Sequence, residues 1–225
     1  MANTETTINA VMHPKPSETS IDIEKTIRAL ERNKFVVHYF ETGAEAVAYL
    51  KNRIQNKCVA IGDSRTLLEI GVHDALSEVN EDITDIQRPL PGESFRDTAL
   101  RTMGRDVFLT SVNALSQTGE MVNIDGTGNR VAASLFGSQE VFFVLGVNKI
   151  TPDLASAIYR ARNVAAPLNS KKNKKSSLNP CATLDEKCYD CGSPDRICNA
   201  LTIYYKKMRN MQTMEIIIIN ESLGF

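Results

Sequence analysis

The sequence lacks three features that would point directly to a class of function: a membrane-length apolar run, a surplus of one charge and a rich set of histidines. Its longest apolar stretches, at 141–147 and 215–220, have the length of strands, whereas a membrane helix needs about 20 apolar residues. The formal net charge of −1 excludes a global field that would attract nucleic acid or an anionic membrane. The histidines His13, His38 and His73 stand in unrelated contexts. We therefore predict no membrane span, no nucleic-acid partner and no Ser-His-Asp triad, and assign the histidines to surface or local hydrogen bonds.

The start of the chain also lacks a basic segment followed by an apolar one, so no secretory signal is expected. We predict a cytoplasmic protein with a flexible tail over 1–16 and a single domain over 17–225. Within that domain, 169–199 is predicted to hold a basic linker and a cysteine segment, and 200–225 two closing strands. In a reducing compartment, clustered cysteines are metal ligands or redox groups more often than structural disulfides.

The first half of the chain alternates between helix and strand patterns. Ile23, Ile27 and Leu30 recur at helical spacing, and "TGAE" at 42–45 has the form of a capping box. This alternation predicts an α/β fold with an open, mostly parallel sheet flanked by helices. The predicted elements are a helix from 23, a strand over 34–40, a helix from 43, a strand over 57–62 and a helix over 63–76 that is interrupted near Gly71.

The second half is richer in strands. The segment 114–125 is predicted to form a hairpin that turns at Thr118-Gly119. A helix is expected to begin with Thr151 as its cap and Pro152 at its first position, and to end at Pro167. The other predicted elements are a helix over 91–104, strands over 106–112 and 140–147, a short helix over 130–136, and strands over 200–208 and 214–220.

The first candidate site lies where a buried strand turns into a helix. Free amides at such a turn bind phosphate or carboxylate, and ligands of open α/β sheets collect beyond the carboxyl ends of the strands. The simpler alternative is that Asp63 or Ser64 only caps the helix. The residues proposed to bind a small anion here are Gly62, Asp63, Ser64, Arg65 and Thr66.

The second candidate site is the loop "DGTGNR" at 125–130. Its glycines let backbone amides approach an anion closely, Arg130 can pair with a carboxylate or phosphate, and Asp125 can act as a base. The alternative is a tight loop that glycine merely permits. The glycine spacing fits neither a P-loop nor a dinucleotide-binding motif. The proposed ligand-binding residues are Gly126, Thr127, Gly128, Asn129 and Arg130, with Asp125 as a candidate catalytic residue.

Four of the five cysteines follow the pattern C-x6-C-x2-C-x6-C within 181–198. The central C-x-x-C can direct two thiolates at one ion, and four thiolates suit zinc or an iron–sulfur cluster. Free thiols and redox disulfides remain alternatives, because the spacing matches neither common metal motif. The predicted metal ligands are Cys181, Cys188, Cys191 and Cys198. The sequence does not decide whether they bind zinc or an iron–sulfur cluster.

Several long blocks together resemble the LUD-domain family, the lactate-utilisation proteins. They are "GDSRTLLEIGVHDAL", "DVFLTSVNALSQTGEMVNIDGTGNRVA", "GVNKITPDLASAIYRARNVAAPLN" and "KCYDCGSPDRICNAL". The resemblance covers about residues 20 to 225. It implies a fold similar to the superfamily of ribose-5-phosphate isomerase, glucosamine-6-phosphate deaminase and the CoA transferases. It also implies a role in the oxidation of L-lactate to pyruvate beside partner subunits that carry iron–sulfur clusters.

The same superfamily implies where chemistry would take place. Its members bind phosphorylated sugars or CoA with glycine-containing loops at strand ends, and its CoA transferases use a glutamate nucleophile near a glycine turn. In this sequence Gln117 and Thr118 precede Gly119, and glutamine cannot form an acyl anhydride. Glu120, which follows the glycine, is a second candidate acid or base.

These observations predict a component of a redox complex for L-lactate or a related 2-hydroxy acid, which binds a small anionic metabolite. One alternative is a stand-alone enzyme for a phosphorylated metabolite or a CoA ester, using Asp125, Glu120 and Arg130. A non-catalytic interaction subunit is another.

Overall fold

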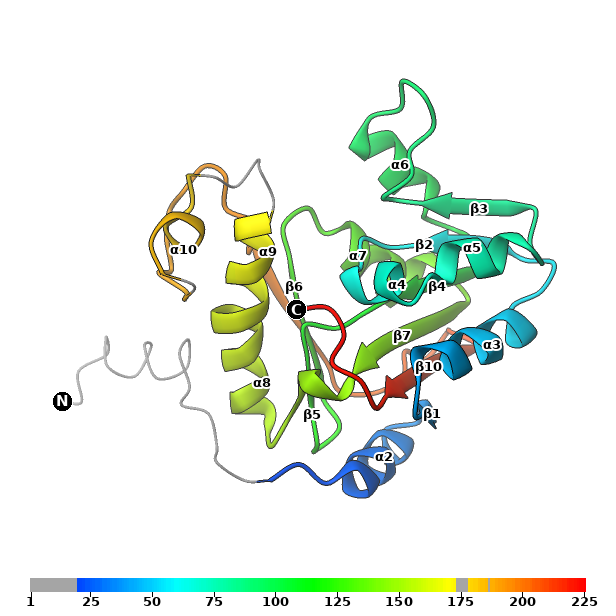
Figure 1. Cartoon of the computed structure of the whole chain (residues 1–225), viewed down its shortest axis with the longest axis horizontal. Helices are drawn as coiled ribbons and strands as arrows, with labels where there is room; N and C mark the ends of the chain where they lie inside the picture. The colour runs from blue at the N-terminus through cyan, green and yellow to red at the C-terminus, as the bar shows by residue number, and fades with distance from the viewer. Residues whose placement is uncertain (1–19, 173–177, 186) are drawn as a thin grey trace.

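The computed structural model of the chain describes residues 20–172, 178–185 and 187–225; the tail predicted for 1–16 lies outside these ranges. Its centre is a six-stranded sheet in which every neighbouring pair of strands is parallel. The predicted α/β class with a mostly parallel sheet is therefore confirmed (Figure 1). In spatial order its strands are β1 (Val36–Phe40), β10 (Thr213–Ile219), β7 (Glu140–Gly146), β4 (Val107–Thr110), β2 (Cys58–Ile61) and β3 (Asp82–Asp85).

Both faces of this sheet are buried, which explains the uninterrupted apolar runs in β7 and β10. Successive side chains point to opposite faces. Phe143 therefore enters one hydrophobic cluster and Phe142 the other, and Ile216 and Ile217 are divided in the same way. One face is covered by three helices on the same side of the sheet (Figure 1). They are α3 (Gly43–Arg53), α4 (Arg65–Glu69) and α5 (Val72–Ser77).

The opposite face packs against a second, smaller sheet and against α2 (Ile23–Arg32). The hairpin predicted around Gly119 is confirmed, since its two strands pair antiparallel there. The outer face of this second sheet is covered by α8 (Leu154–Arg160) through Ala157. Its strands in spatial order are β8 (Ile150–Thr151), β5 (Ala114–Ser116), β6 (Met121–Asp125) and β9 (Ala200–Tyr204).

The local signals for helix boundaries in the first half are confirmed. The Thr42 side chain accepts a hydrogen bond from the Glu45 amide, and the Glu45 carboxylate accepts one from the Thr42 amide. Gly71, with φ of +70°, separates α4 from α5 as expected for a residue without a Cβ. The remaining short elements are α6 (Phe95–Arg101), α7 (Asn129–Ala132), the π-helix η1 (Ala133–Gly137), the 3₁₀ turn η2 (Val147–Lys149) and α10 (Pro180–Thr183).

Two predicted boundaries of the following helix are wrong. Asp153, not Thr151, caps α8: its carboxylate accepts from the Ser156 amide, while Thr151 belongs to β8. The helix also passes Pro167, because α8 continues through the π-helix η3 (Ala161–Ala165) into α9 (Ala166–Lys172). A proline is tolerated near the start of a new helical segment, and a π-turn changes the hydrogen-bond register just before it. Residues 169–172, predicted as linker, are therefore helical.

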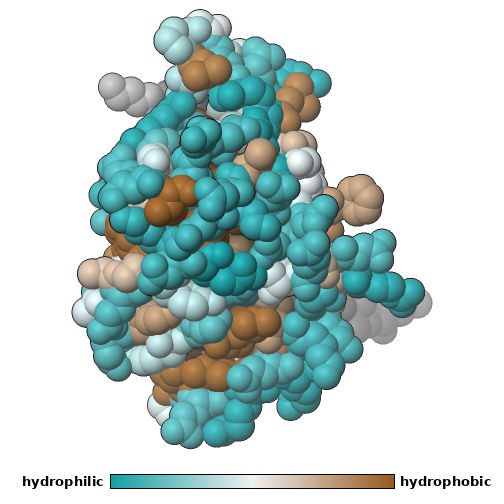
Figure 2. Space-filling view, turned by 90° about the vertical axis from the view of Figure 1, so that its right-hand side faces the viewer, coloured by the Kyte–Doolittle hydropathy of each residue, from teal (hydrophilic) through white to brown (hydrophobic). Residues whose placement is uncertain are grey.

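The two closing strands lie in different sheets. β9 is an edge strand of the smaller sheet, whereas β10 lies between β1 and β7 in the interior of the larger one. Within the described residues, no helix is both long and apolar enough to cross a membrane. The face of the molecule in Figure 2 is mostly hydrophilic, with hydrophobic side chains in separate patches. The large apolar side chains are mainly buried between the layers.

Candidate functional site

The two loops selected from the sequence meet at the carboxyl ends of the parallel strands. Two neighbouring cavities of about 160 and 110 Å³ lie there. The loop after β2 and the loop after β6 line the larger cavity together. The two cavities adjoin and are together called the cleft below, because both are lined by Asp63, Asn113, Arg130, Ala165 and Asn169.

In the loop after β2, the polar side chains are partly occupied by local contacts. Ser64 caps α4, because its hydroxyl accepts a hydrogen bond from the Leu67 amide at 3.3 Å. For this residue the simpler alternative, helix capping, is therefore confirmed. Asp63 accepts from the side chain of Gln87 at 2.9 Å, and Arg65 pairs with Glu69 at 2.6 Å. All three nevertheless line the cleft. Of the other predicted residues, Gly62 lines an adjacent cavity and Thr66 is fully buried beneath the cleft.

The loop after β6 is organised by Asp125. One carboxylate oxygen accepts from the amides of Thr127 and Gly128 at 3.2 and 3.1 Å, and the other accepts from the amide of Val131 at 3.1 Å. The Asp125 carboxylate is only 4 % exposed and accepts hydrogen bonds from three backbone amides. This is the arrangement of a side chain that orders its own loop and caps the following helix. Its residues Gly126, Thr127, Asn129 and Arg130 line the larger cavity, and Gly128 adopts a φ of +84° at the start of α7.

Glu120 does not share this site. It lies in the β5–β6 turn, where its carboxylate accepts from the Thr118 hydroxyl at 2.5 Å. Asp125 lies five residues farther along the chain, at the opposite end of β6. At roughly 3.4 Å per residue in an antiparallel strand, the two residues are about 17 Å apart. The two candidate catalytic carboxylates are therefore not brought together.

Lys149, which is not among the predicted site residues, lines the cleft directly after β7. Its side chain is buried, and the residue is only 4 % exposed. Its Nζ donates to the Thr66 hydroxyl at 2.9 Å and to the Ser111 hydroxyl at 3.0 Å. Thr66 follows β2, Ser111 follows β4 and Lys149 follows β7. These three strands are neighbours in the large sheet, so the three side chains lie close together beyond their carboxyl ends.

The electrostatics of this cluster are unusual for a lysine. Burial lowers the pKa of Lys149 to about 7, assisted by the positive charges of Arg160 and Arg130 and opposed by Glu69. Burial likewise lowers the pKa of Arg160 to about 10. A lysine with a pKa near neutrality in a cleft is characteristic of functional sites more than of structural ion pairs. The lowered pKa favours the neutral amine near pH 7 more than in an exposed lysine.

One signal in the sequence could have found Lys149. The same rule that selected the loop after β2 applies to β7, because ligands of parallel sheets collect beyond the carboxyl ends of the strands. Lys149 is the first charged residue after that strand. Its partner Ser111 carries no such signal, because it is one of many hydroxyls near strand ends.

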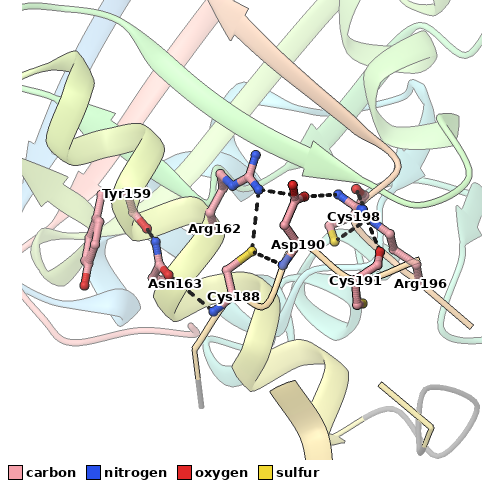
Figure 3. A network of polar contacts seen from close by, with 8 residues as sticks. All are labelled: Tyr159, Arg162, Asn163, Cys188, Asp190, Cys191, Arg196 and Cys198. Carbon is pink, nitrogen blue, oxygen red and sulfur yellow. Dashed lines mark hydrogen bonds and ion pairs between the residues drawn. The ribbon is translucent and has the colours of Figure 1, made fainter. Parts of the chain in front are cut away.

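The cysteine segment forms a separate network beside η3, shown in Figure 3. Arg162 reaches the Cys188 sulfur at 3.6 Å and the Asp190 carboxylate at 3.0 Å. Arg196 lies 3.2 Å from the Cys198 sulfur and 3.2 Å from the same carboxylate. Burial raises the pKa of the Cys198 thiol, while Arg196 acts to lower it.

The described structure does not gather the four cysteines into one metal-binding group. Cys188 and Cys191 lie close enough to Cys198 to influence its pKa, whereas Cys181 belongs to α10. Among the residues that the structure describes, no group of three or more His, Cys, Asp or Glu side chains could hold a metal ion. Arginine contacts occupy two of the sulfurs instead. Metal binding by the four cysteines therefore stays a prediction.

Two of the three histidines make local hydrogen bonds. The ring of His38 lies 2.8 Å from the Tyr49 hydroxyl, and the ring of His73 lies 2.8 Å from the Asp85 carboxylate. His13 lies outside the described residues.

Comparisons with known proteins identify relatives of the fold. A family model described as the LUD domain matches residues 23–219. The chain is also similar to the crystal structure of a DUF162 family protein from Deinococcus radiodurans, with a TM-score of 0.51 and 12 % sequence identity. That alignment covers 88 % of this chain and 95 % of the other, and at this identity it shows a shared fold alone. No curated protein matches the sequence.

Proposed function

The chain belongs to the LUD-domain family, whose model spans residues 23–219, and from this premise we propose that its cleft binds a small carboxylate metabolite. The metabolite class we propose is a 2-hydroxy acid or the corresponding 2-oxo acid, such as L-lactate or pyruvate. The chain would act as the substrate-binding component of a redox complex that oxidises the 2-hydroxy acid.

The charge of the cleft is the observation that carries this proposal. Its smaller cavity is lined by four basic side chains, Arg65, Arg130, Lys149 and Lys172, and by the acidic Asp63. Asp125 adds a second acidic side chain in the larger cavity, and Arg65 is paired with Glu69, so the excess of basic groups lies at Arg130, Lys149 and Lys172. A partly enclosed basic site favours an anion, because Coulomb attraction is stronger there than in bulk water. Arg130 lines both cavities, and a guanidinium can bind a carboxylate through two parallel hydrogen bonds.

The size of the cleft limits the ligand. Cavities of about 160 and 110 Å³ are well below the roughly 300–1,000 Å³ typical of sites for drug-sized ligands. An anion of a few heavy atoms fits this space better than a complete CoA ester. The assignment to a redox complex rests on the family resemblance, and its electron carriers would belong to partner subunits.

The alternative of a stand-alone enzyme for a phosphorylated metabolite is favoured by one observation, because a basic cleft also suits phosphate. It is weakened by two others. Asp125 is held by three backbone amides, and Glu120 lies about 17 Å from it by the rise of a strand. A ligand panel distinguishes phosphates from carboxylates directly.

The binding proposal predicts stabilisation by L-lactate and pyruvate. A ligand present at 100 times its Kd contributes about 2.7 kcal/mol, which corresponds to roughly 5–10 °C in Tm for a domain of this size. In Arg130→Gln, loss of a charge-assisted hydrogen bond is expected to weaken binding by roughly 10- to 100-fold. Differential scanning fluorimetry at fixed ligand concentration measures both effects.

Arg28→Gln is the matched control, because Arg28 is an exposed residue of α2 paired with Glu24. This variant should retain the full ligand-induced shift. Stabilisation by sugar phosphates but not by carboxylates would replace this proposal with the enzyme alternative. The absence of a shift with any of these anions would reject an anion site in the cleft.

We also propose that the four cysteines bind one metal centre, as zinc or an iron–sulfur cluster. Protein purified without oxygen is expected to contain one such centre per chain, and Cys188→Ser should lose most of it. Cys58→Ser is the control, because Cys58 lies in β2 outside the cysteine segment and should leave metal content unchanged. Elemental and sulfide analysis measure the outcome. Metal-free wild-type protein would reject this proposal.

A further inference from the structure

We propose that Lys149 is a nucleophile, and that its neutral amine attacks the ketone carbon of a bound 2-oxo acid to form an imine. This inference rests on the proposed function, because the acid must first occupy the cleft. It assigns to the site a covalent step that carboxylate binding alone does not require.

The position of the Lys149 side chain supports this proposal. Lys149 lines the same cavity as Arg130, so a carboxylate paired with Arg130 would lie next to this lysine. The short 3₁₀ turn after β7 and the two hydroxyls fix the position of the side chain. The backbone at Gly224 also approaches closely: a Cβ there would lie 2.6 Å from the Thr66 hydroxyl and 3.1 Å from Nζ of Lys149. The amine is therefore held in place from several directions.

The hydrogen bonds of the amine suit its neutral form. A neutral amine has two N–H donors and one lone pair, whereas an ammonium has three donors and no lone pair. Within the described residues, Nζ donates to two hydroxyls, those of Thr66 and Ser111. A hydroxyl oxygen can accept from either form of the amine, so both contacts are compatible with the neutral amine that the reaction needs.

Two of the three charges around the amine also favour its neutral form. Arg160 from α8 and Arg130 from α7 both lower the pKa of Lys149, and Glu69 from α4 raises it, while burial is the largest cause. With a pKa lowered to about 7, the neutral amine is far more accessible at neutral pH than in an exposed lysine. An exposed lysine with a pKa of about 10.4 is almost entirely protonated there. Burial next to other cations is a known means of activating a lysine nucleophile.

The covalent step balances without a further reactant. The Nζ lone pair forms a bond to the ketone carbon while one N–H proton of the amine passes to the carbonyl oxygen, which gives a neutral carbinolamine. The new hydroxyl then leaves as water with the remaining N–H proton, and the C=N bond forms. No electrons are gained or lost, and addition of water reverses the sequence. L-lactate has a hydroxyl in place of the ketone, so it binds the same cleft without forming this bond.

Reductive trapping tests this inference on the full chain. With pyruvate and sodium cyanoborohydride, we expect one carboxyethyl group per chain by intact mass, and peptide mapping should place it on Lys149. The adduct should be absent in Lys149→Met and fully retained in Lys25→Met, which removes an exposed lysine from α2. Peptide mapping locates the adduct on the wild-type protein itself, so the test does not depend on the folding of a variant.

Two outcomes would overturn the inference: no adduct, or an adduct spread evenly over exposed lysines. Thermal stabilisation by L-lactate, measured on the same samples, separates this result from failure of the proposed function. If L-lactate stabilises the protein but pyruvate is not trapped on Lys149, the nucleophile is rejected and the binding site stands. If neither effect occurs, both proposals are rejected.

Discussion

Lys149→Met is expected to stabilise the protein by roughly 3 kcal/mol at pH 7, although it removes two hydrogen bonds. The folded protein lowers the pKa of this lysine from 10.5 to about 7, so protonation is unfavourable in the buried site. Methionine has a similar shape and no charge to bury. Urea unfolding of both proteins at pH 7 measures the difference. A residue that costs stability where it lies is characteristic of a functional site.

The pH dependence follows from the direction of this shift. Between pH 7 and 10.5 the unfolded chain binds the lysine proton more strongly than the folded protein does, so wild-type stability from this group rises with pH. The cost of burying the lysine is complete below pH 7 and disappears above 10.5. The advantage of Lys149→Met should therefore decrease steadily as the pH rises through this window.

Lys25→Met provides the comparison, because Lys25 is exposed on α2 and its removal should change the free energy of unfolding by less than about 0.5 kcal/mol. A Lys149→Met variant that is less stable than the wild type at pH 7 would show that the amine is charged and well paired. That result would contradict the electrostatic description of the cleft.

Arg53→Met is expected to destabilise the protein by about 3–5 kcal/mol, the largest loss among these predictions. Arg53 on α3 contacts two carboxylates beneath the large sheet, Glu140 at 2.6 Å and Glu215 at 3.0 Å. The side chains of these glutamates are only 7 % and 3 % exposed. Removing the guanidinium leaves two nearly buried negative charges without their main partner. Urea unfolding of the variant measures the resulting loss in the free energy of unfolding.

Two further variants make this result specific. Arg28→Met removes an arginine of an exposed pair and should cost less than about 1 kcal/mol. The triple variant Arg53→Met, Glu140→Gln, Glu215→Gln should regain most of the stability lost in Arg53→Met, because the buried charges are removed together. A loss below about 1 kcal/mol in Arg53→Met would show that Lys57 and His38, which also contact these glutamates, suffice.

Much of the fold could be predicted because its signals are local. The helix–strand alternation, the capping box at Thr42 and the turn at Gly119 each depend on residues close together in the chain. The placement of β10 could not be predicted, because its apolar run fits any strand buried on both faces. Its position between β1 and β7 depends on contacts between segments far apart in the sequence.

The candidate site could be predicted in part for the same reason. Each loop carried its own glycines and polar residues. The rule for parallel sheets applies to the loop after β2, whereas β6 pairs antiparallel in the smaller sheet, so the meeting of the two loops depends on how the sheets pack. What the sequence could not show was which side chains stay available there. Asp125 is occupied by its own loop, while Lys149 gains its properties only from burial and from hydroxyls contributed by two other strands.

The most direct test of the central claim is to locate L-lactate on the protein by backbone amide chemical shifts. Titration of isotope-labelled wild-type chain should shift the amides of 63–66, 111–113, 125–130 and 149 together, with one common Kd. The same titration of Arg130→Gln should need a much higher concentration. Saturable shifts confined to the cysteine segment at 188–198, or shifts that increase linearly across the surface, would contradict a small-carboxylate site in the cleft.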